Sequence, residues 1–542
     1  MTVITLPPCS RASWLPGVAW CVWLFWSPPA PATPVAAPSG NDTIITIDVD
    51  HPGAVINRNL YGQFAEFVGH GIDQGIWVGE ASAIPNTRGF RNDVVAALRR
   101  LRVPLVRWPG GCFADTYHWR DGIGPRAARP KRMNVYWGGV IEQNAVGTHE
   151  FFDFLEQIGA SAYINGNIGS GTPQEMADWV EYMSGDRDTS LVLERKRNGR
   201  DQPYKIAMFG IGNETWACGG NMRPEYSADL HRRYANFLNT PPYAMFFDPP
   251  PKDPMLKIAS GSNGDDYHFT DVMMANAARF MDALTLHYYT TPTGIMGHFG
   301  ASVAFPEKEW ASTLRTASRI EELVTRHSAV MDRYDPEKRV GLFVDEWGTW
   351  YDPEPDRKPG FLFQQNTLRD AVVAAIYLDV FQHHADRVRM SSIAQMVNVL
   401  QSMILTDGSR MMLTPTYHVF RMHVPFQDST SLPAQVGTQQ YHAGDISLPA
   451  VRASAARAKD GFIYLALTNL DPDRSARIDA ALLRGRARGA TGEVLTGPSM
   501  DAHNDFEAPD RVHPVPFSGR EKNGHVYLDL PAKSVAVLRI LE

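Results

Sequence analysis

The sequence predicts a (β/α)8 TIM barrel joined to a C-terminal, jelly-roll-like all-β sandwich. Three features of the 542-residue chain lead to this prediction. Short apolar runs alternate with amphipathic helical patterns from about residue 60 to residue 417, as in a parallel sheet covered by helices. Period-two runs follow over residues 445–542, and one more such run, at 43–50, precedes the first barrel strand.

The predicted barrel strands are almost continuously apolar, because strands buried on both faces have no solvent side. They are residues 60–67, 103–108, 161–166, 206–211, 256–260, 283–289, 340–347 and 388–395. Eight such strands are the number that closes a (β/α)8 barrel. A doubly wound open sheet is the alternative, but no dinucleotide-binding turn follows the first strand. The barrel is therefore favoured.

Helices are predicted between these strands where apolar residues recur every three or four positions. Such stripes run through 151–158, 176–183, 320–327 and 368–376. The second stripe follows Thr172-Pro173-Gln174-Glu175, a capping box with proline at the first helical position. His327 lies on the third stripe, and a satisfied helix residue is the favoured interpretation over a ligand.

The period-two runs predict a β-sandwich because they are short, closely spaced and separated by Gly, Pro, Asp and Asn turns. They include 462–470, 492–497, 525–530 and 534–540. We expect the early run at 43–50 to join the same sandwich. The predicted organisation is an export signal and linker at 1–40, an N-terminal sandwich strand at 41–56, the catalytic barrel at 57–425, and the C-terminal sandwich at 426–542.

The first forty residues resemble an export signal rather than a part of the fold. Arg11 precedes an apolar stretch at 12–26, and Ala30-Pro31-Ala32 offers a small-residue cleavage site. The apolar stretch is too short to span a bilayer comfortably, and no later segment approaches the length of a membrane helix. The chain is therefore expected to be periplasmic or secreted, with a signal peptide near residues 1–32.

The composition of the chain limits the classes of binding partner that it fits. The net charge of -7 argues against a nucleic acid, whose binding needs a concentrated basic surface. A neutral or weakly charged small partner fits better, and the 13 Trp and 19 Tyr are residues that suit sugar faces. No CxxC, HExxH or clustered His pattern indicates a metal, and no cofactor is predicted.

Two cysteines remain once the leader, with Cys9 and Cys21, is set aside. Cys112 and Cys218 could pair in an exported protein, but buried free thiols are equally compatible with the sequence. A Cys112–His118 nucleophile is a further hypothesis. It is disfavoured because neither the order nor the flanking residues match a known nucleophile motif.

Polar residues at four predicted strand ends carry the functional prediction, since a barrel of this kind places its chemistry there. These ends are Glu66, Asn213-Glu214, His287-Tyr288-Tyr289 and Asp345-Glu346-Trp347. A single Glu after a strand is as often a solvated loop carboxylate. Two glutamates on strands four and seven would face each other across the barrel mouth. Glycoside hydrolysis requires such a pair, one protonated and one ionised.

Long motifs then resemble the α-L-arabinofuranosidases of glycoside hydrolase family 51. They are RWPGGCFADTYHWRDGIGP (107–125), WGGVIEQNAVGTHEF (137–151), GNETWACGGNMRPEYSADLHRRYA (212–235), DEWGTWYDP (345–353) and AQMVNVLQSMILTD (394–407). The resemblance runs from about Asn57 to the C-terminus. It implies a barrel with a β-sandwich and a retaining enzyme that removes terminal arabinofuranosyl residues from arabinoxylan, arabinan or their oligosaccharides.

The resemblance also assigns roles by position. Glu214 matches the general acid/base and Glu346 the nucleophile. Other matched positions hold sugar hydroxyls or contact the nucleophile: Glu66, Arg107, Cys112, Asn213, Tyr289 and Gln395. Cys112 falls where some relatives carry Asn, while Trp347 and Trp350 either shape the sugar site or pack in the core. Family members often form oligomers, so a homo-oligomer is compatible with the resemblance.

Two other functions stay open at this stage. An endo-β-glucanase or a xylosidase could use the same barrel and the same carboxylates. The fold and the catalytic residues indicate which type of bond is broken more clearly than which sugar is bound. A non-catalytic carbohydrate-binding protein is the second alternative. Such a protein would be expected to lose a catalytic carboxylate, and this chain keeps both.

Overall fold

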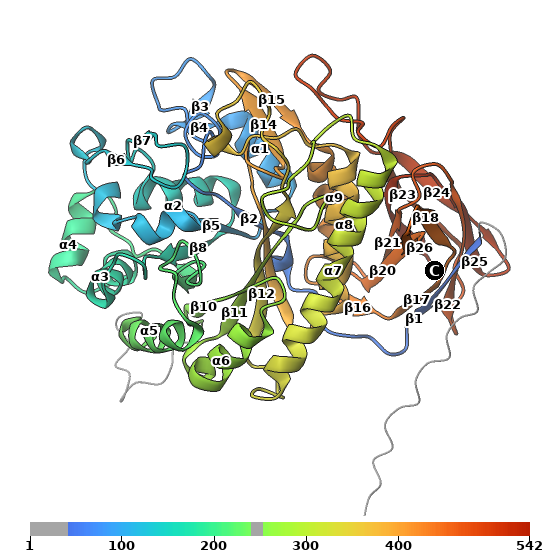
Figure 1. The fold of residues 1–542 in the computed structure, drawn as a ribbon, viewed down its shortest axis with the longest axis horizontal. Coiled ribbons are helices and arrows are strands. Elements are labelled where there is room, and N and C mark those ends of the chain that lie inside the picture. The colour runs from blue at the N-terminus through green and yellow to red at the C-terminus, as the bar shows by residue number, and fades with distance from the viewer. Residues whose placement is uncertain (1–41, 240–252) are drawn as a thin grey trace, which may run out of the picture. The chain divides into compact units, whose positions relative to one another are not determined.

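Eight parallel strands close into a barrel in the computed structural model, which describes residues 42–239 and 253–542 (Figure 1). All eight strands lie where the sequence predicts them. In order around the barrel they are β2 (Gly62–Phe64), β5 (Leu105–Trp108), β8 (Ser161–Gly166), β9 (Ile206–Ile211), β10 (Leu256–Asn263), β11 (Ala283–Thr290), β12 (Gly341–Thr349) and β13 (Val388–Ile393). The alternative of an open sheet is therefore wrong.

Helices follow the strands and bury the apolar stripes seen in the sequence. They are α1 (Asn92–Arg100), α2 (Thr148–Ile158), α3 (Pro173–Ser184), α4 (Ser190–Arg197), α5 (Pro224–Phe237), α6 (Tyr267–Ala277), α7 (Glu307–Asp332), α8 (Leu368–His383) and α9 (Pro415–Met422). His327 on α7 is a satisfied helix residue, as expected, since its two ring nitrogens contact the Thr270 hydroxyl and the Gly264 carbonyl.

The start of α3 differs in one detail from the predicted capping box. The Thr172 hydroxyl accepts from the Glu175 backbone N–H, and Pro173 occupies the first turn, as predicted. The Glu175 carboxylate, however, does not return to the cap. It contacts His118 Nδ1 at 2.8 Å instead, because the fold brings that ring within hydrogen-bonding distance.

The C-terminal domain is a ten-stranded sheet that folds around a core of its own. Its strand order is β16 (Thr430–Leu432), β20 (Val451–Arg457), β21 (Ile463–Asn469), β26 (Ser534–Leu541), β23 (Gly489–Leu495), β24 (Val515–Lys522), β25 (His525–Leu530), β22 (Ala476–Leu483), β1 (Asp42–Asp48) and β17 (Ala434–Gly437). Strand β24 pairs first with β23 and then with β25, so it connects the two halves of the sandwich.

Short hairpins lie outside the barrel and the sandwich. They are formed by β3 (Asn86–Thr87) with β4 (Phe90–Arg91), β6 (Arg132–Met133) with β7 (Ile141–Glu142), β14 (Ile404–Asp407) with β15 (Arg410–Leu413), and β18 (Gln440–Ala443) with β19 (Ile446–Pro449). Among the described residues no helix has both the length and the apolarity to cross a bilayer. The predicted export segment lies outside the residues that the structure describes.

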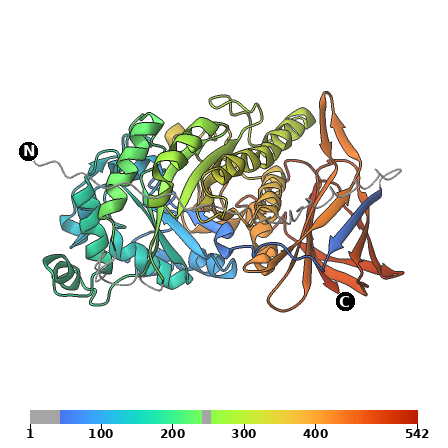
Figure 2. The same cartoon turned by 90° about the horizontal axis from the view of Figure 1, so that it is seen from below.

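The N-terminal strand β1 joins the sandwich, as the sequence predicts. It runs parallel to β22 and antiparallel to β17 (Figure 2). Its side chains alternate, because a strand with one buried face turns every second residue to the core. Ile45 and Ile47 are fully buried in the sandwich core, whereas Ile44, which precedes them on the opposite face, is 37% exposed.

Helix α8 is buried on all sides because it lies between the barrel and the sandwich. It packs against β12 on the barrel side and against β20, β21 and β26 on the sandwich side. Two polar contacts accompany this packing: Trp310 Nε1 of α7 donates to the Leu470 carbonyl at 2.9 Å, and Arg452 of β20 donates to Asp379 at 2.8 Å. The burial of this helix on every side is thus explained by neighbours in both domains.

The alternation in β1 can be tested with two neighbouring isoleucines. Ile45→Ala leaves a cavity in the sandwich core and should lower the free energy of unfolding by roughly 2–5 kcal/mol, whereas Ile44→Ala should change it by less than about 0.5 kcal/mol. Urea denaturation followed by circular dichroism measures both variants. Equal losses for the two would show that β1 is not seated in the sandwich as described.

Candidate active site

The carboxyl ends of the barrel strands bring the predicted site residues together. Glu66 follows β2, Arg107 lies on β5, Asn213 and Glu214 follow β9, Tyr289 lies on β11, Glu346 on β12, and Gln395 follows β13. Arg107, Asn213, Glu214, Tyr289 and Glu346 are connected through contacts described below, and Glu66 and Gln395 contact each other. The residues are far apart in sequence, and the closed barrel makes them neighbours because parallel strands end at one face.

Glu346 is held by donors from two other strands. Arg107 Nη1 donates to its Oε1 at 2.7 Å, and the Tyr289 hydroxyl donates to its Oε2 at 2.9 Å. Arg107 also reaches Asn213 Oδ1 through Nη2 at 2.6 Å and pairs with Asp345 through Nε at 3.3 Å. The planar guanidinium thus fixes a carboxylate, an amide and a second carboxylate at once, which a lysine ammonium cannot do.

Glu214 occupies a different environment. Its side chain is 16% exposed, and burial raises the pKa of its carboxyl above the ordinary value. The hydrogen bond from His287 opposes this rise, and the negative charge of Glu346 adds to it. Glu214 is thus the carboxyl that holds its proton more tightly than usual, while Glu346 is paired with a cation.

The Glu214 backbone also has an unusual conformation, with φ at +39°. Such angles are uncommon for residues with a side chain and cluster at functional sites. The conformation is supported locally, since the Ala217 and Gly219 N–H groups both donate to the Glu214 carbonyl. The end of β9 therefore turns sharply and presents the carboxyl to the barrel mouth.

His287 connects the two glutamates. Its Nδ1 lies 2.9 Å from Glu214 Oε1 and 3.5 Å from Glu346 Oε2, and its Nε2 lies 3.1 Å from Asp345 Oδ1. Burial lowers the pKa of the His287 ring, but the charge of Glu346, the hydrogen bonds to Asp345 and Glu214, and the charge of Asp345 outweigh it and raise the pKa to about 10. His287 is therefore protonated at neutral pH and donates from both nitrogens.

Asp345 anchors this histidine and Arg107. It also accepts from the Tyr163 hydroxyl at 2.9 Å. Burial raises the pKa of Asp345, but Arg107 and His287 outweigh it, and the net shift is downward. Asp345 thus stays ionised in the barrel interior beneath the two glutamates.

Glu66 collects four donors. The Gly111 and Phe113 N–H groups and Trp137 Nε1 donate to its Oε1 at 3.0 to 3.1 Å, and Gln395 Nε2 donates to its Oε2 at 3.1 Å. Burial, with the charge of Glu346 second, raises the pKa of Glu66 to about 7. This carboxyl is placed to accept from or donate to a hydroxyl near neutral pH.

The two glycines of RWPGGCF allow the close approach of backbone to both carboxyls. A Cβ on Gly110 would lie 2.6 Å from the Glu66 side chain, and one on Gly111 would lie 2.7 Å from Glu346 Oε1. No side chain fits at either position. The glycines are therefore required by packing against the acids rather than by the turn alone.

Asp115 binds the loops after β8 and β9 to its own segment, which follows β5. Its carboxylate accepts from the N–H groups of Ile168, Gly169 and Asn213 at 2.8 to 2.9 Å. Burial raises the pKa of Asp115 to about 7 against the opposing effect of these donors. Asp115 thus fixes the backbone on which Asn213 and Glu214 stand.

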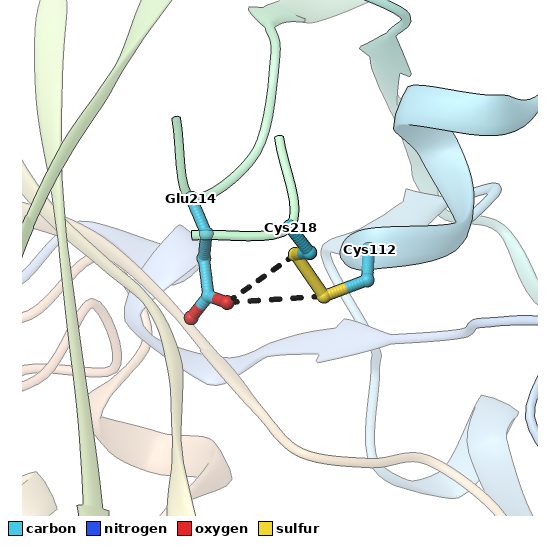
Figure 3. A group of neighbouring side chains, drawn as sticks. All are labelled: Cys112, Glu214 and Cys218. Atoms are coloured by element: carbon cyan, nitrogen blue, oxygen red, sulfur yellow. Dashed lines mark hydrogen bonds between the residues drawn. A yellow bond between two sulfur atoms is a disulfide. The ribbon is translucent and has the colours of Figure 1, made fainter. Parts of the chain in front are cut away.

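Cys112 and Cys218 form a disulfide, an outcome that the sequence left open. Figure 3 shows the pair beside Glu214. The sulfur of Cys218 lies 3.6 Å and that of Cys112 3.9 Å from Glu214 Oε2. The hypothesis of a cysteine nucleophile is therefore wrong for this structure, because neither sulfur is a free thiol.

Three tryptophans near the site have different positions and contacts. Trp347 is fully buried and stacks on Tyr377 at 4.7 Å between ring centres, so it belongs to the core. Trp350 lies edge-on to Tyr289 at 5.1 Å and so borders the site. Trp137, through Glu66, is a site residue that the sequence reasoning did not assign. Trp137 begins one of the family motifs, but its contact with Glu66 depends on how the loop that carries it folds.

His287, Asp345 and Asp115 also belong to the site and were not assigned roles from the sequence. The first two stand at predicted strand ends, in HYY and DEW, which was the available signal. One ligand atom each from Glu214, His287 and Glu346 lies within 4.8 Å of the other two, a spacing that a metal ion also needs. The hydrogen bonds of His287 to Glu214 and of Arg107 to Glu346 account for this spacing without an ion.

Two carboxyls at the mouth of a barrel, one with a pKa raised by burial and one paired with arginine, are the arrangement that glycoside hydrolases use. Models of the α-L-arabinofuranosidase 1 domain and of the α-L-arabinofuranosidase C-terminal domain match residues 97–302 and 345–534. An intracellular exo-α-L-arabinofuranosidase of Bacteroides ovatus is 46% identical, covering 94% of this chain and 98% of that protein.

Solved structures agree with these matches. The family 51 arabinofuranosidase of Xanthomonas axonopodis pv. citri is 53% identical, with a TM-score of 0.89 over 92% of this chain and 99% of that one. The α-L-arabinofuranosidase of Thermotoga maritima, solved with arabinose, is 27% identical, with a TM-score of 0.80 over 92% and 100%. The chain belongs to the α-L-arabinofuranosidases of glycoside hydrolase family 51.

A comparison of two buried arginines can distinguish a catalytic role of Arg107 from a contribution to stability. Arg107→Lys keeps the charge but loses the three-way geometry, so kcat/KM should fall by about 100-fold. Arg387 is the control: it is also 1% exposed and paired with two acids, Asp332 and Asp335, but it lies at the opposite end of the barrel, before β13. Arg387→Lys should lower Tm and leave kcat/KM nearly unchanged. Equal kinetic losses would contradict a specific role for Arg107.

Proposed function

We propose that the enzyme is a retaining, exo-acting α-L-arabinofuranosidase that releases terminal arabinofuranosyl residues from arabinoxylan, arabinan or derived oligosaccharides. The observation that carries this proposal is the spacing of the two glutamates: one oxygen of Glu214 and one of Glu346 lie within 4.8 Å. In retaining enzymes the carboxyls are about 5 to 5.5 Å apart, and in inverting enzymes more than about 6.5 Å. The spacing leaves no room for a water between carboxyl and sugar.

In the first step Glu346 attacks the anomeric carbon while Glu214 protonates the departing glycosidic oxygen. Arg107 and Tyr289 hold the attacking carboxylate in one orientation before the sugar arrives. Positioned groups of this kind reduce the entropy lost in reaching the transition state. A glycosyl–enzyme ester and a free aglycone result.

In the second step Glu214, now ionised, takes a proton from water, and the water oxygen displaces Glu346 from the anomeric carbon. The charged His287 stabilises Glu214 in this state through the 2.9 Å contact of Nδ1 with Oε1. Because Oε1 is bound to His287, Oε2 is the oxygen that exchanges the proton with the leaving group and the water. Two inversions at carbon restore the original anomeric configuration.

The remaining polar groups suit sugar hydroxyls. Arg107 holds Asn213 Oδ1, which directs the amide nitrogen away from the guanidinium and leaves it as a donor for the 2-hydroxyl. Glu66 and Gln395, linked at 3.1 Å, form a second polar pair on the other side of the mouth. Hydrogen bonds to the 2-hydroxyl strengthen as positive charge develops in the ring.

The exo mode and the arabinofuranosyl group are supported by the relatives, of which the 46%-identical one is named an exo-α-L-arabinofuranosidase. A non-catalytic sugar-binding protein fits poorly, since both carboxyls and their partners are in place. We also propose that the chain is exported. The apolar leader and a disulfide, which persists in oxidising compartments, support this.

The products report the reaction type directly. Incubation with linear and branched arabino-oligosaccharides and arabinoxylo-oligosaccharides should release arabinose alone, and ¹H NMR of the first product should show the α-anomer before mutarotation. Aryl xyloside and a soluble β-glucan serve as controls and should react at least about 100-fold more slowly. Initial β-arabinose would contradict retention, and faster β-glucan cleavage would contradict the proposed substrate.

The two glutamates should fail in different ways. Glu346→Ala should abolish turnover of every arabinofuranoside, because no ester can form. Glu214→Ala should spare substrates with good leaving groups, such as 2,4-dinitrophenyl, and reduce hydrolysis of alkyl or sugar leaving groups by about 1,000-fold or more. Steady-state kinetics with a series of leaving groups measures both.

The pH profile gives a second measurement on the same variants. In the wild type the rate at high pH should fall as Glu214 loses its proton, at a pH above the ordinary carboxyl range because burial raises its pKa. Glu214→Ala should lose this basic limb with activated substrates. A basic limb that persists, or equal losses for good and poor leaving groups, would refute the assignment of Glu214.

A further inference from the structure

A disulfide lies directly against the carboxyl that protonates the leaving group. The sulfur atoms of Cys218 and Cys112 lie 3.6 and 3.9 Å from Glu214 Oε2 (Figure 3). The opposite oxygen, Oε1, is bound to His287 at 2.9 Å. The Glu214 carboxyl is thus held between a charged imidazole on one side and two sulfurs on the other.

The disulfide also joins two loops that carry different parts of the site. Cys112 stands between Gly111 and Phe113, whose N–H groups bind Glu66. Cys218 lies in the turn after Glu214, where Gly219 N–H donates to the Glu214 carbonyl. The covalent bond therefore connects the backbone that binds Glu66 with the turn that presents Glu214.

A second, hydrogen-bonded connection links the Glu214 turn to Glu66. The Tyr136 hydroxyl donates to the Cys218 carbonyl at 2.9 Å, and the adjacent Trp137 donates to Glu66. Asn213 Nδ2 lies 3.7 Å from the Cys218 sulfur. The acid/base turn is thus held to the loop after β5 by two links, the hydrogen bond of Asn213 N–H to Asp115 and the covalent disulfide.

The sulfurs affect the proton of Glu214 as well as its position. A disulfide has no S–H, so it cannot donate to a carboxylate, and it fills space that water would otherwise occupy. Thiols at the same distances would donate to Oε2 and stabilise the ionised form. The other groups that act on Glu214 are His287, Glu346 and Arg107, and reduction of the disulfide changes none of them chemically.

We propose that the Cys112–Cys218 disulfide is a positioning element for Glu214, and that its reduction by a small dithiol leaves a folded but slower enzyme. This inference rests on the proposed acid/base role of Glu214. Both cysteines are only half-buried, so a small dithiol can reach them.

Reduction requires two electrons and two protons, both supplied by the dithiol. One dithiol sulfur, as thiolate, attacks a cysteine sulfur and breaks the S–S bond, which forms a mixed disulfide and releases the other cysteine as a thiol. The second dithiol sulfur then displaces the remaining cysteine and forms a cyclic disulfide. Oxidation in air or by an oxidised disulfide reverses the change.

Cys112→Ser/Cys218→Ser tests the inference in the full-length chain. The variant should lower kcat/KM for an alkyl arabinofuranoside by about tenfold or more and for the 2,4-dinitrophenyl substrate much less, because only the first needs the proton. The basic limb of its pH profile should move to lower pH, since serine hydroxyls donate to the Glu214 carboxylate. A purely structural disulfide would shift Tm and leave both the leaving-group dependence and the basic limb unchanged.

Dithiol treatment of the wild type is the second measurement and does not depend on folding of the variant. Dithiothreitol, with free thiols counted and Tm recorded, should produce the same leaving-group-dependent loss, and reoxidation should restore the rate. The double variant is the matched control, because the same treatment should not change its rate. Unchanged kinetics in a wild type shown to be reduced would overturn the inference.

The outcome is distinguishable from failure of the proposed function. If Glu214→Ala shows no leaving-group dependence, the acid/base assignment itself is wrong. If Glu214→Ala shows that dependence and the cysteine variant lowers both substrates equally, or neither, the acid/base assignment stands and the positioning role of the disulfide is refuted.

Discussion

The site depends on how charge is balanced inside the barrel mouth. Five carboxyls, those of Glu66, Asp115, Glu214, Asp345 and Glu346, are assembled around two cations, Arg107 and His287. Two cations cannot neutralise five anions in a site of low dielectric, so some carboxyls must keep their protons. Arg107 decides which, because it binds Asp345 and Glu346 directly and leaves Glu214 to burial and to His287. The different tasks that we propose for the two glutamates follow from this one arrangement.

The loops at the carboxyl ends make this arrangement possible at close range. Gly110 and Gly111 lack side chains and so let the backbone pack directly against Glu66 and Glu346. Asp115 accepts hydrogen bonds from backbone N–H groups of two loops and so fixes the turn before Glu214. The disulfide adds a covalent distance between the same loops. Each loop is therefore constrained by another loop rather than by its own strand, which is how a site on loops reaches the precision of one on a rigid element.

Much of the fold and part of the site could be predicted from sequence. Apolar runs located all eight barrel strands, and the alternation around Ile45 placed a strand from the N-terminal end of the described chain in the sandwich. The strand-end rule identified Glu214 and Glu346. It could not assign His287 or Trp137, because their roles consist of contacts with residues that are distant in sequence. The capping box at Thr172 was half right for the same reason, since His118 comes from a different loop.

The sequence by itself determined the periodicities, and with them the barrel, the sandwich and the two glutamates, because local apolar patterns follow from burial alone. Only the tertiary structure decided that Cys112 and Cys218 pair, that His287 bridges the glutamates, and that Glu66 gathers four donors. These facts depend on distances of a few ångströms between segments separated by more than forty residues. Closure of the barrel sets such distances, and the pattern of any one segment does not contain them.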